Sequence, residues 1–109
     1  MSDSDSTVIP RPKQREKRET RLAPPYNVVL LNDDHHSMEF VVMVLSKVFG
    51  YQLEKCVQLM LTAHTSGRAI VWSGSKEVAE LKVEQVQTFH EMKGEKDIGA
   101  LGCDVEPAP

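Results

Sequence analysis

Three glycines, each closing a stretch with helical periodicity, set the strongest limit on how this chain can fold. They are Gly50, Gly67 and Gly94. Glycine readily takes the left-handed conformation with which many helices end, so each of the three marks a helix C-terminus. The apolar residues before each glycine recur at spacings of three and four, which places them on one helix face. The sequence therefore predicts three amphipathic helices.

Capping residues mark where two of these helices begin. Ser37 can cap the first helix, which ends at Gly50, and Ser75 can cap the third, which runs to Gly94. The second helix is expected over Leu53 to Thr65, before Gly67. The inward faces are predicted to consist of Val41, Val44, Leu45 and Val48 in the first helix, Val57, Met60, Leu61 and His64 in the second, and Ala79, Val83, Val86 and His90 in the third.

Short β-branched and aliphatic runs between the helices indicate strands. Residues 26–31 and 69–72 form two such runs, and residues 98–105 form a third that Gly99 and Gly102 weaken. The order is strand, helix, helix, strand, helix, strand. This order predicts an α+β fold in which three helices pack on a small three-stranded sheet that is at least partly antiparallel.

The chain divides into a polar extension, residues 1–23, and one folded domain, residues 24–109. The extension carries six basic and four acidic residues, a net charge of +2, which leaves about −5 for the rest of a chain whose total is −3. An acidic domain argues against nucleic acid as a partner, because phosphate-binding surfaces need clustered Lys and Arg. No secretory or membrane-spanning segment is evident, and Cys56 and Cys103 match no metal or disulfide pattern. We therefore expect a cytoplasmic protein with two buried, reduced cysteines.

The densest group of polar residues, at positions 32–36, follows the first strand and reads Asn-Asp-Asp-His-His. One interpretation is structural, since Asn and Asp commonly bond the amides of turns and helix starts. A second is a small metal-dependent hydrolase that uses Asp33, Asp34, His35 and His36. The side chains of adjacent residues rarely all point at one ion, and neither HExxH nor CxxC is present, which argues against a metal site.

A third interpretation brings in the second helix, where His64 is the one polar group on a face shared with Met60 and Ala63. The Asn32 carbonyl, the Asp34 carboxylate and one imidazole nitrogen of His64 are all hydrogen-bond acceptors, and an ammonium group has three donors. Met38 and Met60 would offer flexible, polarizable walls to a neighbouring apolar side chain, although core packing is the commoner role of a methionine. The pattern is compatible with a receptor for a positively charged ammonium group.

At this point the sequence resembles a known family. The segment Val28-Val29-Leu30-Leu31-Asn32-Asp33-Asp34, followed by Met38-Glu39-Phe40-Val41, is similar to the signature of ClpS-type Clp protease adaptors, the bacterial recognins of the N-degron pathway. The resemblance continues through residues 58–61 and His64, Gly67 with residues 69–70, residues 77–80 and residues 82–83, and covers nearly everything after Pro24.

The resemblance implies an adaptor with no catalytic activity, cofactor or metal. Such proteins deliver substrates that begin with Leu, Phe, Tyr or Trp to an unfoldase of the ClpA or ClpC type, and we expect a monomer. By the same resemblance, Asn32 and His64 bond the α-ammonium directly and Asp34 bonds it through water. The implied side-chain pocket consists of Leu30, Leu31, Asp33, Met38, Met60, Ala63 and Leu101. Met38 is the implied gatekeeper against β-branched first residues, and Glu77 and Lys82 the implied unfoldase-docking residues.

The sequence departs from the family pattern at the pocket. His36 and Ser37 stand where the family usually has Thr-Pro, and Ala63 stands where valine is common. Alanine in place of valine is expected to enlarge the pocket, and His36 is expected to add a titrating wall. A two-residue insertion is needed before Leu101 to bring it into register. We therefore expect the ammonium site to be conserved and the side-chain pocket to differ.

Overall fold

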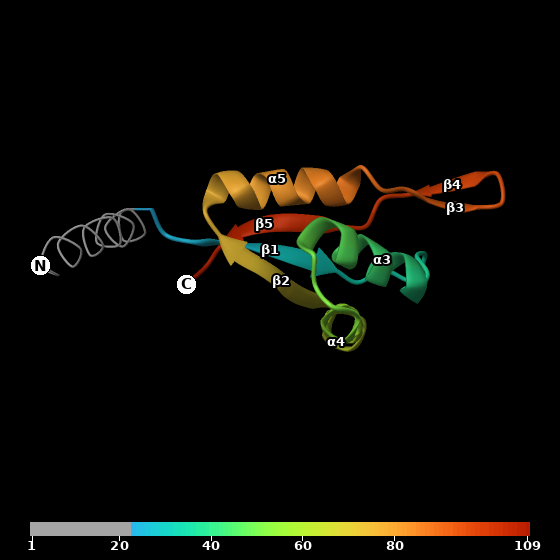
Figure 1. Cartoon of the computed structure of the whole chain (residues 1–109), viewed down its shortest axis with the longest axis horizontal. Helices are drawn as coiled ribbons and strands as arrows, with labels where there is room; N and C mark the ends of the chain where they lie inside the picture. The colour runs from blue at the N-terminus through green and yellow to red at the C-terminus, as the bar shows by residue number, and fades with distance from the viewer. Residues whose placement is uncertain (1–22) are drawn as a thin grey trace, which may run out of the picture.

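The computed structural model describes residues 23–109, so the extension predicted for residues 1–23 lies outside the described residues except for Ala23. The described part contains three helices and five strands (Figure 1). In chain order they are β1 (Tyr26–Leu31), α3 (Met38–Phe49), α4 (Leu53–Ser66), β2 (Arg68–Gly74), α5 (Lys76–Gln87), β3 (Glu91–Lys93), β4 (Lys96–Gly99) and β5 (Cys103–Pro107). The predicted α+β class is confirmed.

The main sheet has three strands in the order β2-β1-β5, and both strand pairs are antiparallel. The sheet is therefore fully antiparallel. α5 lies along β5 and β1, α4 contacts β2, and α3 packs against α4 and α5 (Figure 1). A β-bulge in β2 inserts Val71 between the partners of Val28 and Val29, and both Val71 and Trp72 contact the hydrophobic core.

The helix boundaries near the first strand follow the predicted caps. The Ser37 hydroxyl accepts a hydrogen bond from the backbone N–H of Phe40, and Gly50 ends α3 with a φ of 71°. Gly67 ends α4 in the same way, with a φ of 91°. Ser75 caps α5 by accepting from the N–H of Val78. Ser37 and Gly67 thereby set where α3 begins and where α4 ends, next to the site described below.

The prediction that the third helix continues to Gly94 is wrong. α5 ends at Gln87, because the hydroxyl and the N–H of Thr88 both donate to the Gln85 carbonyl and tighten the last turn. Phe89 then turns against the core. His90 is not part of a helix stripe, and its Nδ1 lies 3.0 Å from a carboxylate oxygen of Asp97.

Gly94 belongs instead to a hairpin that the sequence reading did not predict. β3 and β4 pair in antiparallel fashion, with Lys93 opposite Lys96 and a two-residue connection between them. Gly94 has a φ of 65°, as the first residue of such a tight connection requires. In Figure 1 this hairpin extends beyond the rest of the domain.

The expected last strand over residues 98–105 is also divided. Gly99, with a φ of 96°, ends β4, and the chain passes through Leu101 before Cys103 begins β5. A residue with a left-handed φ cannot continue the extended strand, so Gly99 is the last residue to pair with β3, and residues 103–107 pair with β1. Leu101 is thereby left in a short connection between two sheets.

One hydrophobic cluster lies between the main sheet and the helices, and Cys56 and Cys103 are buried in it as free thiols. The prediction for both cysteines is confirmed. In α4 the buried residues are Cys56, Met60 and Ala63, whereas Leu61, predicted to face inward, is exposed. Within residues 23–109, every helix is too short or too polar to cross a membrane.

Candidate functional site

A cavity of about 370 Å³, which includes its part open to solvent, lies where the end of β1 meets α3 and α4. Seven of its eleven lining residues are apolar, and Asn32, Asp33, His36 and His64 supply the polar groups. The full lining is Leu30, Leu31, Asn32, Asp33, His36, Met38, Val41, Met60, Ala63, His64 and Leu101. An apolar cavity with a few convergent polar groups is the usual form of a small-ligand site.

Backbone hydrogen bonds bring three distant segments together at this cavity. The N–H of Asn32 donates to the Gly67 carbonyl over 3.0 Å, which ties the end of β1 to the end of α4. The N–H of Leu31 donates to the Gly102 carbonyl over 2.9 Å, which brings in the segment that carries Leu101. His64 precedes Gly67 by less than one helical turn, so Asn32 and His64 reach the same cavity.

The depth of the cavity comes from residues with little exposed surface. Leu30, Ala63 and Leu101 are each 3% exposed and Met60 is 8% exposed. Met38, by contrast, is 50% exposed, because it is the first residue of α3 and lies at the cavity mouth. Buried apolar side chains from β1, α4 and the β4–β5 connection therefore form the inner part of the cavity, and the exposed Met38 lies at its mouth.

Asp33 organises the loop between β1 and α3. One of its carboxylate oxygens accepts hydrogen bonds from the N–H groups of His35 and His36, at 2.8 and 2.9 Å. Burial pushes the pKa of Asp33 upward, but these bonds and the His36 ring outweigh it, so the pKa is lowered. Within the cluster at positions 32–36, Asp33 is thus the residue that bonds the amides of the turn, as the structural interpretation predicted.

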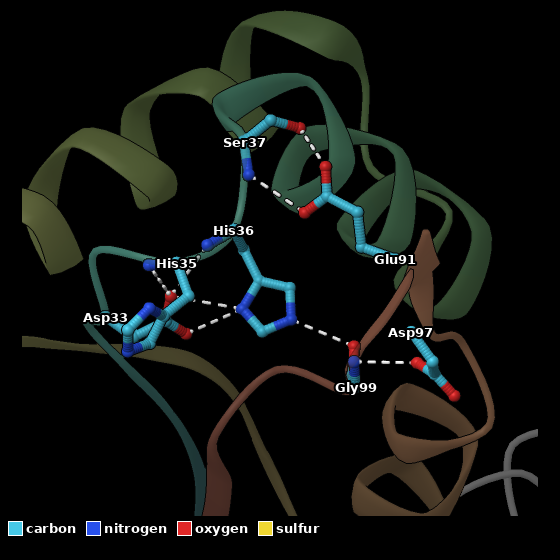
Figure 2. Close-up of polar contacts among 7 residues, drawn as sticks. All are labelled: Asp33, His35, His36, Ser37, Glu91, Asp97 and Gly99. Atoms are coloured by element: carbon cyan, nitrogen blue, oxygen red, sulfur yellow. Dashed lines mark hydrogen bonds and ion pairs between the residues drawn. The ribbon is translucent and has the colours of Figure 1, made fainter. Parts of the chain in front are cut away.

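His36 bridges this loop to the hairpin (Figure 2). Its Nδ1 lies 2.9 and 3.0 Å from the two Asp33 carboxylate oxygens, and its Nε2 lies 2.9 Å from the Gly99 carbonyl oxygen. The ring also stacks on Phe40. Burial alone would lower the pKa of His36, but the Gly99 carbonyl and the Asp33 carboxylate raise it above the ordinary value.

A second bridge joins the same hairpin to the start of α3. The Glu91 carboxylate accepts from the Ser37 N–H over 2.9 Å and from the Ser37 hydroxyl over 2.7 Å (Figure 2). Slight burial would raise the pKa of Glu91, and the two bonds from Ser37 outweigh it, so the pKa is lowered. His36 and Ser37 are thus two adjacent residues that both bond the hairpin.

Ten of the eleven residues predicted for the ammonium site and the side-chain pocket line the cavity. Asp34 is the exception: it is exposed and does not line the cavity. Val41 is a lining residue that the site prediction missed, although its place one turn after Met38 on α3 could have indicated it.

The two predicted docking residues lie on α5, away from the cavity. Glu77 is exposed, beside Val78, Glu80, Leu81 and Glu84. Lys82 is half-buried, and its ammonium donates to the Val48 carbonyl over 3.0 Å near the end of α3. Five residues correspond to about 140° of rotation around a helix, so the two side chains point in different directions.

The alternative of a metal centre finds no arrangement to support it in the part of the chain that the structure describes. Across residues 23–109, no three His, Cys, Asp or Glu side chains gather closely enough to hold one ion. His36 directs both ring nitrogens to Asp33 and Gly99, which leaves neither nitrogen free to bind a metal.

Comparisons with known proteins agree with the fold. Residues 21–99 match the family described as ATP-dependent Clp protease adaptor protein ClpS. The chain is 51% identical over 88 residues to the ATP-dependent Clp protease adapter protein ClpS of Pectobacterium carotovorum subsp. carotovorum (strain PC1), with 79% of each chain covered. It is 48% identical over 79 residues to the protein of the same name from Xanthomonas campestris pv. campestris (strain 8004), with 71% of this chain and 74% of the relative covered.

A solved structure gives the same assignment. The fold is similar to the structure of Agrobacterium tumefaciens ClpS2 bound to L-phenylalaninamide, with a TM-score of 0.68, 33% sequence identity, and coverage of 79% of this chain and 99% of that one. The family match spans most of the chain, and the resemblance stated from the sequence is confirmed. The protein belongs to the ClpS family of ATP-dependent Clp protease adaptors.

Proposed function

We propose that this adaptor binds the free α-amino group and the bulky hydrophobic side chain at the N-terminus of substrate proteins, and delivers them to a Clp unfoldase. The observation that carries the proposal is the cavity in which Asn32 and His64 stand beside a deep apolar lining. A free N-terminal residue combines an ammonium group with a side chain on one carbon atom. The cavity offers a complement to each.

The polar half of the proposal rests on acceptors. The Asn32 carbonyl oxygen and a neutral His64 nitrogen can each accept a hydrogen bond from an ammonium group. Asp34 is exposed in the same loop and outside the cavity lining, which suits a contact through water and adds negative charge nearby. An acetylated or internal residue has no ammonium and would leave these groups without a partner.

The apolar half of the proposal rests on the buried lining. Leu30, Met60, Ala63 and Leu101 would surround the side chain, and Met38 would close over it and disfavour β-branched first residues. A related protein, Agrobacterium tumefaciens ClpS2, has been solved with L-phenylalaninamide, a molecule with both a free amino group and an aromatic side chain. We expect N-terminal Leu, Phe, Tyr and Trp to bind here.

The energies are sufficient for such a small site. Hydrogen bonds to a charged group contribute about 1.5–3 kcal/mol each, and burial of a Leu or Phe side chain contributes about 1.5–3 kcal/mol. Three polar contacts and one buried side chain can therefore reach the roughly 8 kcal/mol of micromolar binding after ordering costs.

For delivery, we propose that the exposed surface of α5 around Glu77 docks on the N-terminal domain of a ClpA- or ClpC-type unfoldase. Exposed Val78 and Leu81 stand beside Glu77 and offer apolar contact area. Lys82 would contribute from the edge of this surface, where its ammonium also caps the end of α3. We further propose that the adaptor acts as a monomer in the cytoplasm, without a cofactor and without catalysis.

The decisive experiment is a fluorescence-anisotropy panel of peptides that differ only in their first residue. We expect free N-terminal Leu and Phe peptides to bind with micromolar affinity or better, and their acetylated counterparts not to bind. Equal binding of free and acetylated peptides would overturn the proposal. Binding to an unfoldase without any binding to peptides would instead indicate a pure scaffold.

A further inference from the structure

The two polar contacts of the His36 ring need one more N–H donor than a neutral imidazole has. A neutral imidazole has one N–H donor and one acceptor nitrogen. Here both nitrogens face groups that can only accept, the Asp33 carboxylate at 2.9 Å and the Gly99 carbonyl at 2.9 Å. Both contacts are hydrogen bonds only when both nitrogens carry a proton. The geometry therefore requires the imidazolium form of His36.

The surroundings favour this charged form. Asp33, from the loop that carries His36, and Glu91, from β3, are the carboxylates whose charges act on the ring, and Phe40 covers one ring face. The His36 side chain is only 6% exposed, so its bonds are poorly screened by water. Two acceptors and a nearby second carboxylate hold the proton in place.

Gly99 lies two residues before Leu101, which is 3% exposed and lines the cavity. Gly99 is held from its other side as well, because its N–H donates to an Asp97 carboxylate oxygen over 2.8 Å. We propose that His36 is a positioning residue of the side-chain pocket: its doubly protonated ring ties the Asp33 loop to Gly99 and thereby holds Leu101 in the pocket wall. This inference rests on the proposed function, because it concerns the width of the same pocket.

Loss of the proton would undo one half of the bridge. The bond to a carboxylate is the stronger of the two, so a neutral ring would keep its proton on Nδ1 toward Asp33. The bare Nε2 would then face the Gly99 carbonyl oxygen with lone pair against lone pair. When His36 deprotonates, the segment from Gly99 to Leu101 loses its bond to the Asp33 loop and keeps only the Leu31–Gly102 backbone bond beside the cavity, so Leu101 is held less firmly in the pocket wall.

The first test observes the ring directly. In the full-length chain without peptide, an NMR titration of the ¹⁵N-labelled imidazoles should show protons on both nitrogens of His36 at about pH 6. Its midpoint should lie above the value of about 6.5 typical of an unperturbed histidine. A midpoint at or below about 6.5 would overturn the inference, and this measurement needs no variant.

The second test measures binding of a free N-terminal Phe peptide by the wild-type chain and by His36→Gln. At about pH 6 the variant should bind on the order of tenfold more weakly, the effect of one lost charged hydrogen bond. The peptide amine titrates equally in both experiments, so the ratio of the two dissociation constants isolates His36. This ratio should fall toward one as the pH is raised to about 9, where an imidazole loses its proton.

His35→Gln is the matched control. His35 is exposed in the same loop, and it bonds Asp33 through its backbone N–H, which the substitution keeps. Its side chain does not line the cavity, so the affinity for the peptide should not change. A ratio that is one at every pH, or that does not vary with pH, would overturn the inference alone. Failure of the wild-type chain to bind any free N-terminal peptide would overturn the proposed function as well.

Discussion

Asn32 and His64 approach the cavity from two segments that one backbone hydrogen bond, from Asn32 to Gly67, holds together. Replacement of either side chain by alanine leaves that backbone bond in place. We therefore expect Asn32→Ala and His64→Ala to fold normally and to weaken binding of a free N-terminal Phe peptide about 10- to 100-fold, the equivalent of one hydrogen bond to a charged group. Fluorescence anisotropy measures the effect.

Acetylated peptide provides the control for this pair of variants. Because the two side chains are proposed to act on the ammonium alone, neither substitution should alter whatever residual binding the acetylated peptide shows. Equal losses for free and acetylated peptides would assign Asn32 and His64 to the shape of the cavity rather than to recognition of the charge.

Ala63 sets the room available for the bound side chain. It is 3% exposed and lines the cavity from α4, between Met60 and His64. Ala63→Val adds two methyl groups to this wall, so we expect a loss of affinity for N-terminal Trp that exceeds the loss for N-terminal Leu by about tenfold or more. The ratio of the two dissociation constants reports the change.

A thermal melt must accompany the Ala63→Val measurement, since extra volume at a buried position can also strain the core. If the variant keeps its melting temperature and yet binds Trp and Leu peptides in the wild-type ratio, Ala63 does not determine pocket size.

At the scale of elements, the hairpin formed by β3 and β4 is attached to α3 through Ser37 and Glu91. Ser37 donates to Glu91 with both its N–H and its hydroxyl, while the same hydroxyl caps α3. We expect Glu91→Gln to lower the free energy of unfolding by about 1 kcal/mol at neutral pH, a value reduced for the solvent exposure of the pair. Urea denaturation measures this difference.

The effect of Glu91→Gln should depend on pH in a defined direction. The pKa of Glu91 is lower in the folded than in the unfolded protein, so its contribution is present above the unfolded value of about 4.3. The contribution is lost as the pH falls through the lowered folded value. Wild type and variant should therefore converge in stability toward about pH 3, and a constant difference at acid pH would contradict the assigned role.

The same elements show how far the sequence could predict the fold. Ser37, Gly50 and Gly67 act through bonds to residues three or four positions away, so local pattern sufficed to place α3 and the end of α4. The end of α5 depends on Thr88, whose hydroxyl competes for the Gln85 carbonyl, and periodicity carries no sign of that bond. Gly94 was predicted to end a helix because a helix C-terminus and a tight hairpin turn both need a residue with a positive φ.

The site divides in the same way. Most residues that line the cavity could be predicted, because β1, α3 and α4 have clear patterns and the resemblance to the family includes Asn32, His64 and Leu101. The His36 contact with Gly99 joins residues 63 positions apart, and the Ser37 contact with Glu91 joins residues 54 apart. Pairings of that kind arise only when the whole fold positions the hairpin, so no local pattern could predict them.

At the scale of the whole molecule, capture and delivery should be separable. The cavity is complete within residues 30–101. Deletion of residues 1–23 should therefore leave the affinity for a free N-terminal Phe peptide unchanged, and it should slow degradation of a substrate by the cognate Clp unfoldase and peptidase. Peptide anisotropy and a fluorescent-substrate degradation assay measure the two activities. Loss of peptide binding on truncation would make the extension part of the site.

Binding should also be visible in the stability of the folded domain, because the cavity is assembled from β1, α3, α4 and the β4–β5 connection and exists only when all of them are in place. A ligand that binds only the folded state stabilises it by about 2.7 kcal/mol at a concentration 100 times its dissociation constant. For a domain of this size, that corresponds to an increase in melting temperature of roughly 10–20 °C.

Calorimetry should show this increase with a free N-terminal Phe peptide. It should show none with the acetylated peptide, or with Asn32→Ala at the same peptide concentration. An equal increase with the acetylated peptide would mean that the domain is stabilised through its apolar lining alone, and that the free amino group is not what it recognises.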